Sequence, residues 1–340
     1  MLYAVIAAWL MATIGTVLAM RYARSRALLD QPGDRRSHDV PTPRGGGVAI
    51  VLAVVVVGLG VLVATPTRPD GLAAVWGAAL AGFLVVAAVG WLDDHRPMSV
   101  RVRLLVHVGA AGLFSAVSWF ATGDALITVV AFLAPLVLTN VWNFMDGING
   151  IASTQAIAVA IFLSLALTGT ATTLALALAA ATWAFLPYNF PRARIFLGDV
   201  GSGALGYFLG VLFTLAVWRQ WLQAPGIGGA VLLALPLSAF LIDASFTLAR
   251  RILHGERWWT PHVQHAYQVS SRRLGHAWVT MGFLGWTVLA CLLAVSARAQ
   301  SELFVLVMTV GWYTLGVFAW WYIQRWARAG KSAVRNGIST

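Results

Sequence analysis

Eleven apolar segments, each about 20 residues long, constrain the fold of this chain more than any other feature. A helix of that length rises by about 30 Å, the thickness of the hydrocarbon core of a membrane. Only 10% of the 340 residues are charged, whereas about a quarter are charged in an ordinary soluble domain. The sequence therefore predicts an all-α, polytopic membrane helix bundle. The predicted spans are 2–20, 45–64, 72–92, 104–121, 125–142, 151–169, 171–187, 202–218, 227–248, 276–296 and 302–323.

Some details of this bundle are less strongly marked in the sequence. Only Gly169 and Thr170 separate the sixth span from the seventh, so a count of ten spans stays open. Pro135 and Pro236 lie inside spans and would kink them. The first span has neither a basic leader nor a cleavage site, and we expect it to be retained. We predict one membrane domain over residues 1–323, followed by a basic cytoplasmic tail over residues 324–340.

The arginines and lysines predict the orientation of the bundle. Twenty of the 23 fall on the side that carries residues 21–44, and only Arg68, Arg219 and Arg298 fall on the other. Because short cytoplasmic loops are enriched in basic residues, the first side is predicted to be cytoplasmic. The N-terminus would then lie outside and the C-terminus inside. The net charge of +11 is thus a topology signal, and we do not expect nucleic-acid binding.

Polar motifs gather on the predicted cytoplasmic side, in residues 35–47, 91–103, 143–150, 188–203 and 254–268. A transporter would be expected to place such groups near the bilayer midplane. The one-sided placement favours an enzyme that joins a soluble substrate to a lipid head group, over a transporter or lipid flippase.

The most unusual of these stretches is residues 143–150, which read NFMDGING between two spans. Asn143, Asp146 and Asn149 recur at intervals of three, so they would share one side if the helix continued through them. We predict that this stretch forms one wall of a polar site.

Two carboxylates, Asp93 and Asp94, close the third span. Adjacent carboxylates repel each other and are best tolerated beside a cation or a proton. They are therefore candidates for a metal ligand or a general base. The alternative, a solvated helix end balanced by Arg96, Arg101 and Arg103, stays open.

Residues 196–203 read FLGDVGSG and precede the eighth span. Glycines allow backbone N–H groups to approach an anion at a helix start, and Asp199 has the oxygen ligands that Mg²⁺ prefers. The alternative is that Asp199 caps the helix. The lysine of a P-loop is absent.

The longest loop on this side, residues 250–273, contains His262 and His265. Arginines and histidines in such a loop are suited to a diphosphate, although topology alone would explain the arginines. A zinc site is disfavoured because no third ligand is evident and the single cysteine, Cys291, lies in a span.

Three other features have plainer interpretations. Residues 35–47 form either a rigid basic turn or a segment whose glycines approach a ligand. Asp243, inside a span, is expected to pair with Arg250 and orient the following loop. His107 is expected to be packed and hydrogen-bonded.

Together, these clusters resemble those of the polyprenyl-phosphate N-acetylhexosamine-1-phosphate transferases, the family that includes MraY and WecA. The resemblance covers about residues 30–275. Residues 37–38, 41–47, His262 and 265–268 are most similar to the branch typified by WbpL, which starts O-antigen-type polysaccharides.

This resemblance implies transfer of a sugar 1-phosphate from a UDP-N-acetylhexosamine to undecaprenyl phosphate, with release of UMP. The cofactor would be Mg²⁺, with Mn²⁺ as an alternative, and the site would face the cytoplasm at a bacterial inner membrane. A non-catalytic relative is the other alternative, which the retained aspartates disfavour. A homodimer is left open.

The resemblance also implies roles for individual residues. Asp93, Asp94 and Asp146 would be the catalytic carboxylates, and Asp199 would ligate the metal. The substrate-binding residues would be His38, Arg44, Asn143, Gly147, Ile148, Asn149, Arg194, Phe196, His262 and His265. Among these, Phe196 would stack on uracil and Asn149 would face it, although the family commonly has Asp at that position. The reduced histidine stretch argues against a muramyl-pentapeptide donor and favours an N-acetylglucosamine-like sugar or a modified deoxy- or amino-sugar.

Overall fold

The computed structural model describes residues 1–31, 40–64, 72–224, 226–257, 259–260 and 262–335, with side chains to residue 326. Its helices are α1 (Leu2–Ser25), α2 (Val48–Ala64), α3 (Leu72–His95), α4 (Val100–Thr122), α5 (Ala125–Met145), α6 (Ile151–Ser164), α7 (Gly169–Asn189), α8 (Asp199–Gln223), α9 (Ile227–Ala234), α10 (Ser238–Leu253), α11 (Ala266–Leu274), α12 (His276–Ser296) and α13 (Glu302–Arg335). A 3₁₀ turn, η1 (Leu235–Leu237), joins α9 to α10. Strands β1 (Leu29–Asp30) and β2 (Thr42–Pro43) pair antiparallel.

The helix at the centre of the bundle is α8. In α8, 94% of an 18-residue apolar window is buried, compared with 17% in α1. It packs mainly against α3 and α5. Gly206 and Gly210 lie against the α5 backbone at Leu138 and Pro135, where a Cβ would clash. Small residues permit this close approach of membrane helices, and α8 thereby carries its first residue, Asp199, to the middle of one end of the bundle.

Each of the eleven predicted spans falls on a helical segment, which confirms the all-α membrane bundle. Over the described part of the chain, nine helical segments are long and apolar enough to cross a membrane, with α9, η1 and α10 counted together as one segment. The two shorter apolar helices are α2, with 17 residues, and α6, with 14. The break after α6 comes at residues 165–168, earlier than the predicted break at Gly169 and Thr170. The number of crossings stays a prediction.

The effects of prolines and of polar helix sequences account for the other differences between the predicted spans and the observed helices. Pro236 interrupts the ninth span as predicted, because a 3₁₀ turn replaces regular helix there. Pro135, by contrast, is accommodated within a continuous α5. Helix α11 was not predicted, since its polar sequence has no apolar run. Helix α13 continues to Arg335, so the predicted tail begins as helix.

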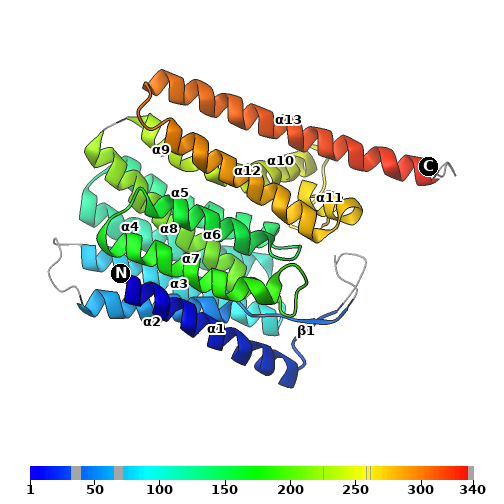
Figure 1. Ribbon diagram of the computed structural model, residues 1–340, viewed down its shortest axis with the longest axis horizontal. Coiled ribbons are helices and arrows are strands. Elements are labelled where there is room, and N and C mark those ends of the chain that lie inside the picture. Colours follow the sequence, from blue (N-terminus) through cyan, green and yellow to red (C-terminus); the bar gives the residue numbers. More distant parts are fainter. Residues whose placement is uncertain (32–39, 65–71, 225, 258, 261, 336–340) are drawn as a thin grey trace.

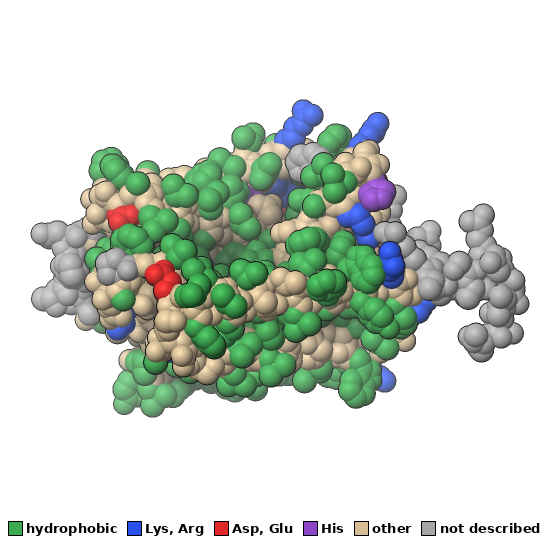
Figure 2. Space-filling view, turned by 90° about the horizontal axis from the view of Figure 1, so that it is seen from above, with side chains coloured by type: hydrophobic (Ala, Val, Ile, Leu, Met, Phe, Trp, Pro, Cys, Tyr) green, Lys and Arg blue, Asp and Glu red, His purple; other side chains and the backbone are tan. Residues whose placement is uncertain are grey.

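The helices run roughly parallel to the long axis of the molecule, with the start of α1 and the end of α13 at opposite ends (Figure 1). Strand β1, helix α11 and the end of α13 lie at the same end (Figure 1). Figure 2 shows most of the Lys and Arg side chains on the visible face towards this end, and its acidic side chains towards the other. This separation agrees with the charge asymmetry read from the sequence.

Cysteine labelling tests the orientation. In a Cys291→Ser background, Ala299→Cys and Arg26→Cys each place one thiol at an exposed position, at opposite ends of the bundle. We expect a membrane-impermeant maleimide to label residue 299 in intact cells, and residue 26 only after permeabilisation, because the basic end is predicted to be cytoplasmic. The reverse labelling pattern would invert the topology.

Candidate active site

A cavity of about 670 Å³ lies at the basic end of the bundle. Each of the five polar clusters contributes to it, although the clusters are far apart in sequence. It is lined by Asp30, Arg44, Asp93, Asp94, Pro97, Met98, Val100, Arg103, Asn143, Phe144, Asp146, Gly147, Ile148, Asn189, Phe196, Gly198, Asp199, Ser202, His262, Tyr267 and Gln268. Its size and its few convergent polar groups are typical of a small-molecule site.

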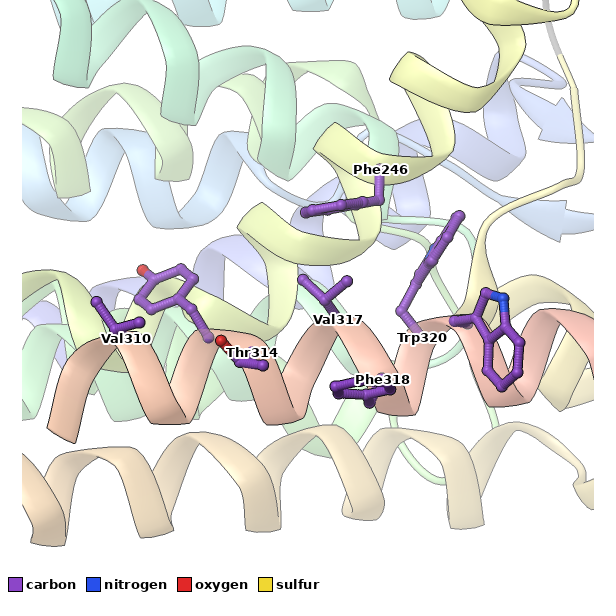
Figure 3. Close-up of a pocket in the computed structure, with 8 residues that line it drawn as sticks. Phe246, Val310, Thr314, Val317, Phe318 and Trp320 are labelled. Atoms are coloured by element: carbon purple, nitrogen blue, oxygen red, sulfur yellow. The ribbon is translucent and has the colours of Figure 1, made fainter. Parts of the chain in front are cut away.

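An apolar groove of similar volume, about 680 Å³, lies between α10 and α13. Figure 3 shows Phe246 of α10 facing a row of α13 side chains that includes Val317 and Trp320. No charged side chain lines this groove among the described residues. It therefore lacks groups for chemistry on phosphates, and the cavity at the basic end is the candidate site.

Asp94 fixes the start of α8 at this site. Its side chain is buried and accepts hydrogen bonds from the backbone N–H groups of Asp199 and Val200, each at 3.1 Å. Gly198 precedes them with a positive φ of 76°, and a Cβ there would clash with the Asp94 carboxylate. The guanidinium of Arg44 donates to the carbonyl oxygen of Asp94. The carboxylate oxygens of Asp94 are thus committed to the helix start, which makes it a positioning residue in this geometry.

Arg103 bridges two of the remaining carboxylates. Its Nη1 lies 2.8 Å from Asp93 Oδ2 and 3.1 Å from Asp199 Oδ2. The other oxygen of Asp199, Oδ1, accepts a hydrogen bond of 2.7 Å from Asn143 Nδ2. Both Asp93 and Asp199 keep some solvent exposure, so they remain accessible from the cavity.

Asp30 and Asp146 are the other carboxylates of the cavity, and no basic side chain within the described part of the chain pairs with Asp146. Burial raises the pKa of Asp146 well above its usual range, and the nearby carboxylates of Asp199 and Asp94 raise it further. A cation bound between these carboxylates would lower that pKa and relieve the repulsion. Asp146 is therefore a candidate metal ligand or general base whose negative charge a bound cation would balance.

The 143–150 turn is clamped from two sides. Helix α5 ends at Met145, so Asn143, Asp146 and Asn149 do not share one helical face as the spacing suggested. The Tyr267 hydroxyl donates to the Phe144 carbonyl at 3.0 Å, and it lies where a Cβ on Gly147 would be. On the other side, Asn189 Oδ1 accepts from the N–H of Gly150, which has a φ of +73°. Glycine at these two positions therefore allows the turn to fit.

Asp243 anchors the second wall of the site, but not through the predicted partner. It accepts hydrogen bonds from the backbone N–H groups of Ala266 and Tyr267, at 2.8 and 3.0 Å, at the start of α11. Arg250 instead donates to Gln264 and Gln324. The predicted orienting role fits these contacts, whereas the predicted Asp243–Arg250 pair is wrong.

The two histidines of this loop occupy different environments. His262 lines the cavity, and burial lowers its pKa to about 4, with His265 and Arg251 lowering it further. A ring that is neutral near pH 7 offers a hydrogen bond rather than a charge. His265 is buried behind it, as the N-cap of α11, with Nδ1 3.5 Å from Asp243 Oδ1.

Three predicted contacts do not line the cavity. Asn149 Nδ2 donates to the Pro191 carbonyl at 3.0 Å. Arg194 donates to the Pro187 carbonyl and lies over the Tyr188 ring. His265 is the third, and His38 falls outside the described residues. The predicted site residues that do line the cavity are Arg44, Asp93, Asp94, Asn143, Asp146, Gly147, Ile148, Phe196, Asp199 and His262.

Sequence reasoning missed Arg103, Tyr267 and Gln268 as cavity residues. Arg103 follows the Ser99 N-cap of α4 by four residues, and this short, capped connection after Asp93 was the available signal. For Tyr267 and Gln268, which lie in the unpredicted helix α11, the signal was weaker. His107, expected to be packed and hydrogen-bonded, is buried beneath the site, and its Nδ1 has no hydrogen-bond partner among the described residues.

Comparison with known proteins identifies the family. The profile of glycosyl transferase family 4 matches residues 76–217. A phospho-N-acetylmuramoyl-pentapeptide-transferase of Moorella thermoacetica is 34% identical over 248 residues, which cover 64% of this chain and 74% of that protein. The chain belongs to glycosyl transferase family 4.

A more extended match within glycosyl transferase family 4 is a probable undecaprenyl-phosphate N-acetylglucosaminyl 1-phosphate transferase of Bacillus subtilis. It is 28% identical over 323 residues, or 87% of this chain and 85% of that protein. An undecaprenyl-phosphate alpha-N-acetylglucosaminyl 1-phosphate transferase of Thermotoga maritima is 27% identical over 266 residues, covering 76% of this chain and 78% of that protein. None of these three similarities singles out the predicted WbpL branch.

The segment matching glycosyl transferase family 4 contains one part of the cavity. Asp93, Asp94, Arg103, Asp146 and Asp199 lie within residues 76–217, as does the 143–150 turn. Arg44 and the wall formed by His262, Tyr267 and Gln268 lie outside it. The carboxylate half of the site is therefore the part shared with the family profile.

The donor set of this glycosyl transferase family 4 site fits a hard divalent cation. Among the described residues, no three His, Cys, Asp or Glu side chains form a complete metal site. Mg²⁺, however, commonly takes only one or two carboxylates and completes its shell with water and substrate phosphates. Asp199 and Asp146 supply such carboxylates, and no thiolate competes with them.

The anchoring role of Asp94 is testable by stability. Asp94→Ala should lower the thermal unfolding midpoint, because two backbone N–H groups of α8 lose their buried acceptor, at a cost of about 1–3 kcal/mol. The control is Asp124→Ala, which removes a partly exposed cap from α5; water replaces that acceptor, so its effect should be smaller. Equal midpoints for the two variants would refute the anchoring role.

A second test asks whether Asn149 stabilises the fold or contacts a nucleotide. Asn149→Ala should lower the unfolding midpoint by removing the bond to Pro191, worth about 1 kcal/mol, and leave the affinity for a uridine nucleotide unchanged in calorimetry. A weaker affinity with an unchanged midpoint would restore Asn149 to the nucleotide site.

Proposed function

We propose that this protein transfers a sugar 1-phosphate from a UDP-N-acetylhexosamine to undecaprenyl phosphate, in a reaction that requires Mg²⁺. The observation that supports it most directly is the convergence of Asp93, Asp146 and Asp199 with Arg44 and Arg103 on one cavity at the basic end of the bundle. The names of the family relatives point to the same class of reaction.

The place of the cavity suits a reaction between a soluble and a membrane-bound substrate. It lies at one end of the apolar bundle, where the phosphate of a membrane lipid would be found. Charged side chains on the face shown in Figure 2 lie mainly towards the two ends, with an apolar surface between them. This arrangement supports a transferase over the alternative of a transporter, which needs polar groups at the membrane midplane.

The chemistry joins two negatively charged phosphates. An oxygen of the lipid phosphate attacks the phosphorus that carries the sugar, and the bond from this phosphorus to the bridging oxygen of UMP breaks. The products are an undecaprenyl-diphosphate sugar and UMP. Arg44 and Arg103 would offset the repulsion between the phosphates, and binding both substrates in one cavity would remove much of the entropic cost.

The carboxylates divide these tasks. Asp199 and Asp146 would hold Mg²⁺, which supplies charge neutralisation at the diphosphate when bound. Asp93, held by Arg103, would orient or deprotonate the lipid phosphate. Phe196 would stack on uracil, while Asn143 and His262 would donate hydrogen bonds to the donor. Asp94 would hold the start of α8 in place.

The donor sugar has two candidates. The extended similarity to the Bacillus subtilis protein favours an N-acetylglucosamine-type donor, and we propose a role at the first step of O-antigen or another cell-envelope polysaccharide. The 34% identity to the Moorella thermoacetica protein supports a muramoyl-pentapeptide donor as the second candidate.

A UMP-release assay tests the proposal. Purified protein is incubated with Mg²⁺, undecaprenyl phosphate and a panel of UDP-N-acetylhexosamines that includes the muramoyl-pentapeptide form. We expect UMP from at least one donor, loss of release on chelation, and a fall of about 100-fold or more in Asp199→Asn, because the charge that holds the metal is removed.

The matched control is Asp124→Asn, which makes the same chemical change at the start of α5, at the end of the bundle opposite the cavity. Asparagine also caps helices, so this variant should keep wild-type turnover. No UMP with any donor would disprove the transferase activity. Normal turnover in Asp199→Asn would remove Asp199 from the metal site.

A further inference from the structure

A second polar cavity, of about 420 Å³, lies at the end of the bundle opposite the candidate active site. It is formed by the ends of α6, α8 and α12 and by the starts of α9 and α13. Its polar lining residues are Arg219, Gln220, Gln223, Arg298, Gln300 and Glu302. The volume is within the range of small-molecule sites, and neither the family profile nor the proposed reaction gives this cavity a role.

The arginines of this cavity are unusual for their position. Only Arg68, Arg219 and Arg298 fall on this side of the predicted topology, because basic residues concentrate on the other side. Two of these three arginines line a single cavity. The topology signal that explains the arginines at the basic end does not explain these.

Neither guanidinium is paired within the described part of the chain. No hydrogen bond or ion pair joins the side chain of Arg219 or Arg298 to another described residue, and Arg219 Nη1 is shielded from solvent. A buried donor without an acceptor is costly, and more so when it is charged. An anion in the cavity would supply the missing acceptor.

Glu302, the acidic residue of the lining, does not supply an acceptor for Arg219 or Arg298. Glu302 Oε1 accepts hydrogen bonds from the backbone N–H groups of Ile227 and Gly228, at 2.9 and 3.1 Å. That oxygen is therefore engaged with the start of α9. With the Glu302 carboxylate counted, the two arginines leave the lining with an excess of one positive charge, and the side-chain amides of Gln220 and Gln223 add further donors.

The rest of the lining is apolar. Its large apolar side chains are Phe162, Leu165, Leu232 and Leu233. Leu222 and Leu303, at the helix ends beside the cavity, are exposed. A ligand that joins a phosphate to an apolar portion would contact both kinds of surface.

We propose that this cavity binds a phosphate group through Arg219 and Arg298. The phosphate comes either from the head group of an anionic phospholipid in the outer leaflet or from a free phosphate anion. The site is separate from the proposed transferase site, and its existence does not rest on the proposed activity.

The test measures binding to the purified full-length chain in detergent. Native mass spectrometry follows the titration of phosphatidylglycerol, and a thermal shift follows the titration of inorganic phosphate. The variants are Arg219→Gln, Arg298→Gln and the pair together. Arg24→Gln is the matched control, since it removes one exposed positive charge at the opposite end of the bundle.

We expect each site variant to weaken binding by about tenfold or more, because a charge-assisted hydrogen bond is lost, and Arg24→Gln to bind as the wild type does. If the arginine variants weaken binding of phosphatidylglycerol alone, the site binds a lipid head group. If they weaken binding of inorganic phosphate, the site binds a free anion.

Unchanged affinity for both ligands in Arg219→Gln and Arg298→Gln would overturn the proposal. So would an equal loss in Arg24→Gln, because the binding would then follow net charge alone. If the double variant does not fold, Arg298→Gln decides the question, since the side chain of Arg298 is exposed.

Discussion

The geometry of this bundle depends on carboxylates that bind the free N–H groups at the start of another helix. Asp94 of α3 binds the start of α8, Asp243 of α10 binds the start of α11, and Glu302 of α13 binds the start of α9. A helix start leaves backbone donors unsatisfied and carries a partial positive charge. Where such a start is buried, a carboxylate from a neighbouring helix satisfies both requirements. Two of these three contacts lie at the candidate active site, where they hold its two walls.

The acidic residues differ in their contacts because they differ in burial and in hydrogen-bond partners, and a linear sequence shows neither. Asp93 and Asp94 are adjacent in the chain, yet Asp94 is committed to α8 while Asp93 shares Arg103 with Asp199. Asp146 is left without a basic partner among the described residues. Asp94 thus holds Asp199, the first residue of α8, in the position where it shares Arg103 with Asp93.

The fold was predictable because apolar length is a strong, local signal. The break at Pro236 was found for the same reason, since proline acts on its own helix. The polar helix α11 was missed because it owes its place to Asp243, not to an apolar run of its own. The site was predicted as five clusters, and its carboxylates do converge. The orientation of single side chains was not predictable: Asn149 donates to Pro191, and His265 is buried behind the cavity, because partners distant in sequence decide these contacts.

Asp94 and Asp243, which hold the starts of α8 and α11, also divide the site into two parts that can change independently. The carboxylate half lies within the segment matched by the family profile and is held by Asp94. The wall that carries His262, Tyr267 and Gln268 lies outside that segment and is held by Asp243. The walls touch where the Tyr267 hydroxyl meets the Phe144 carbonyl. A side-chain change at a position of α11 that lines the cavity would alter the lining while the N–H contacts that fix the helix stay in place. Because those contacts are made by the backbone, they are independent of the side chains at Ala266 and Tyr267.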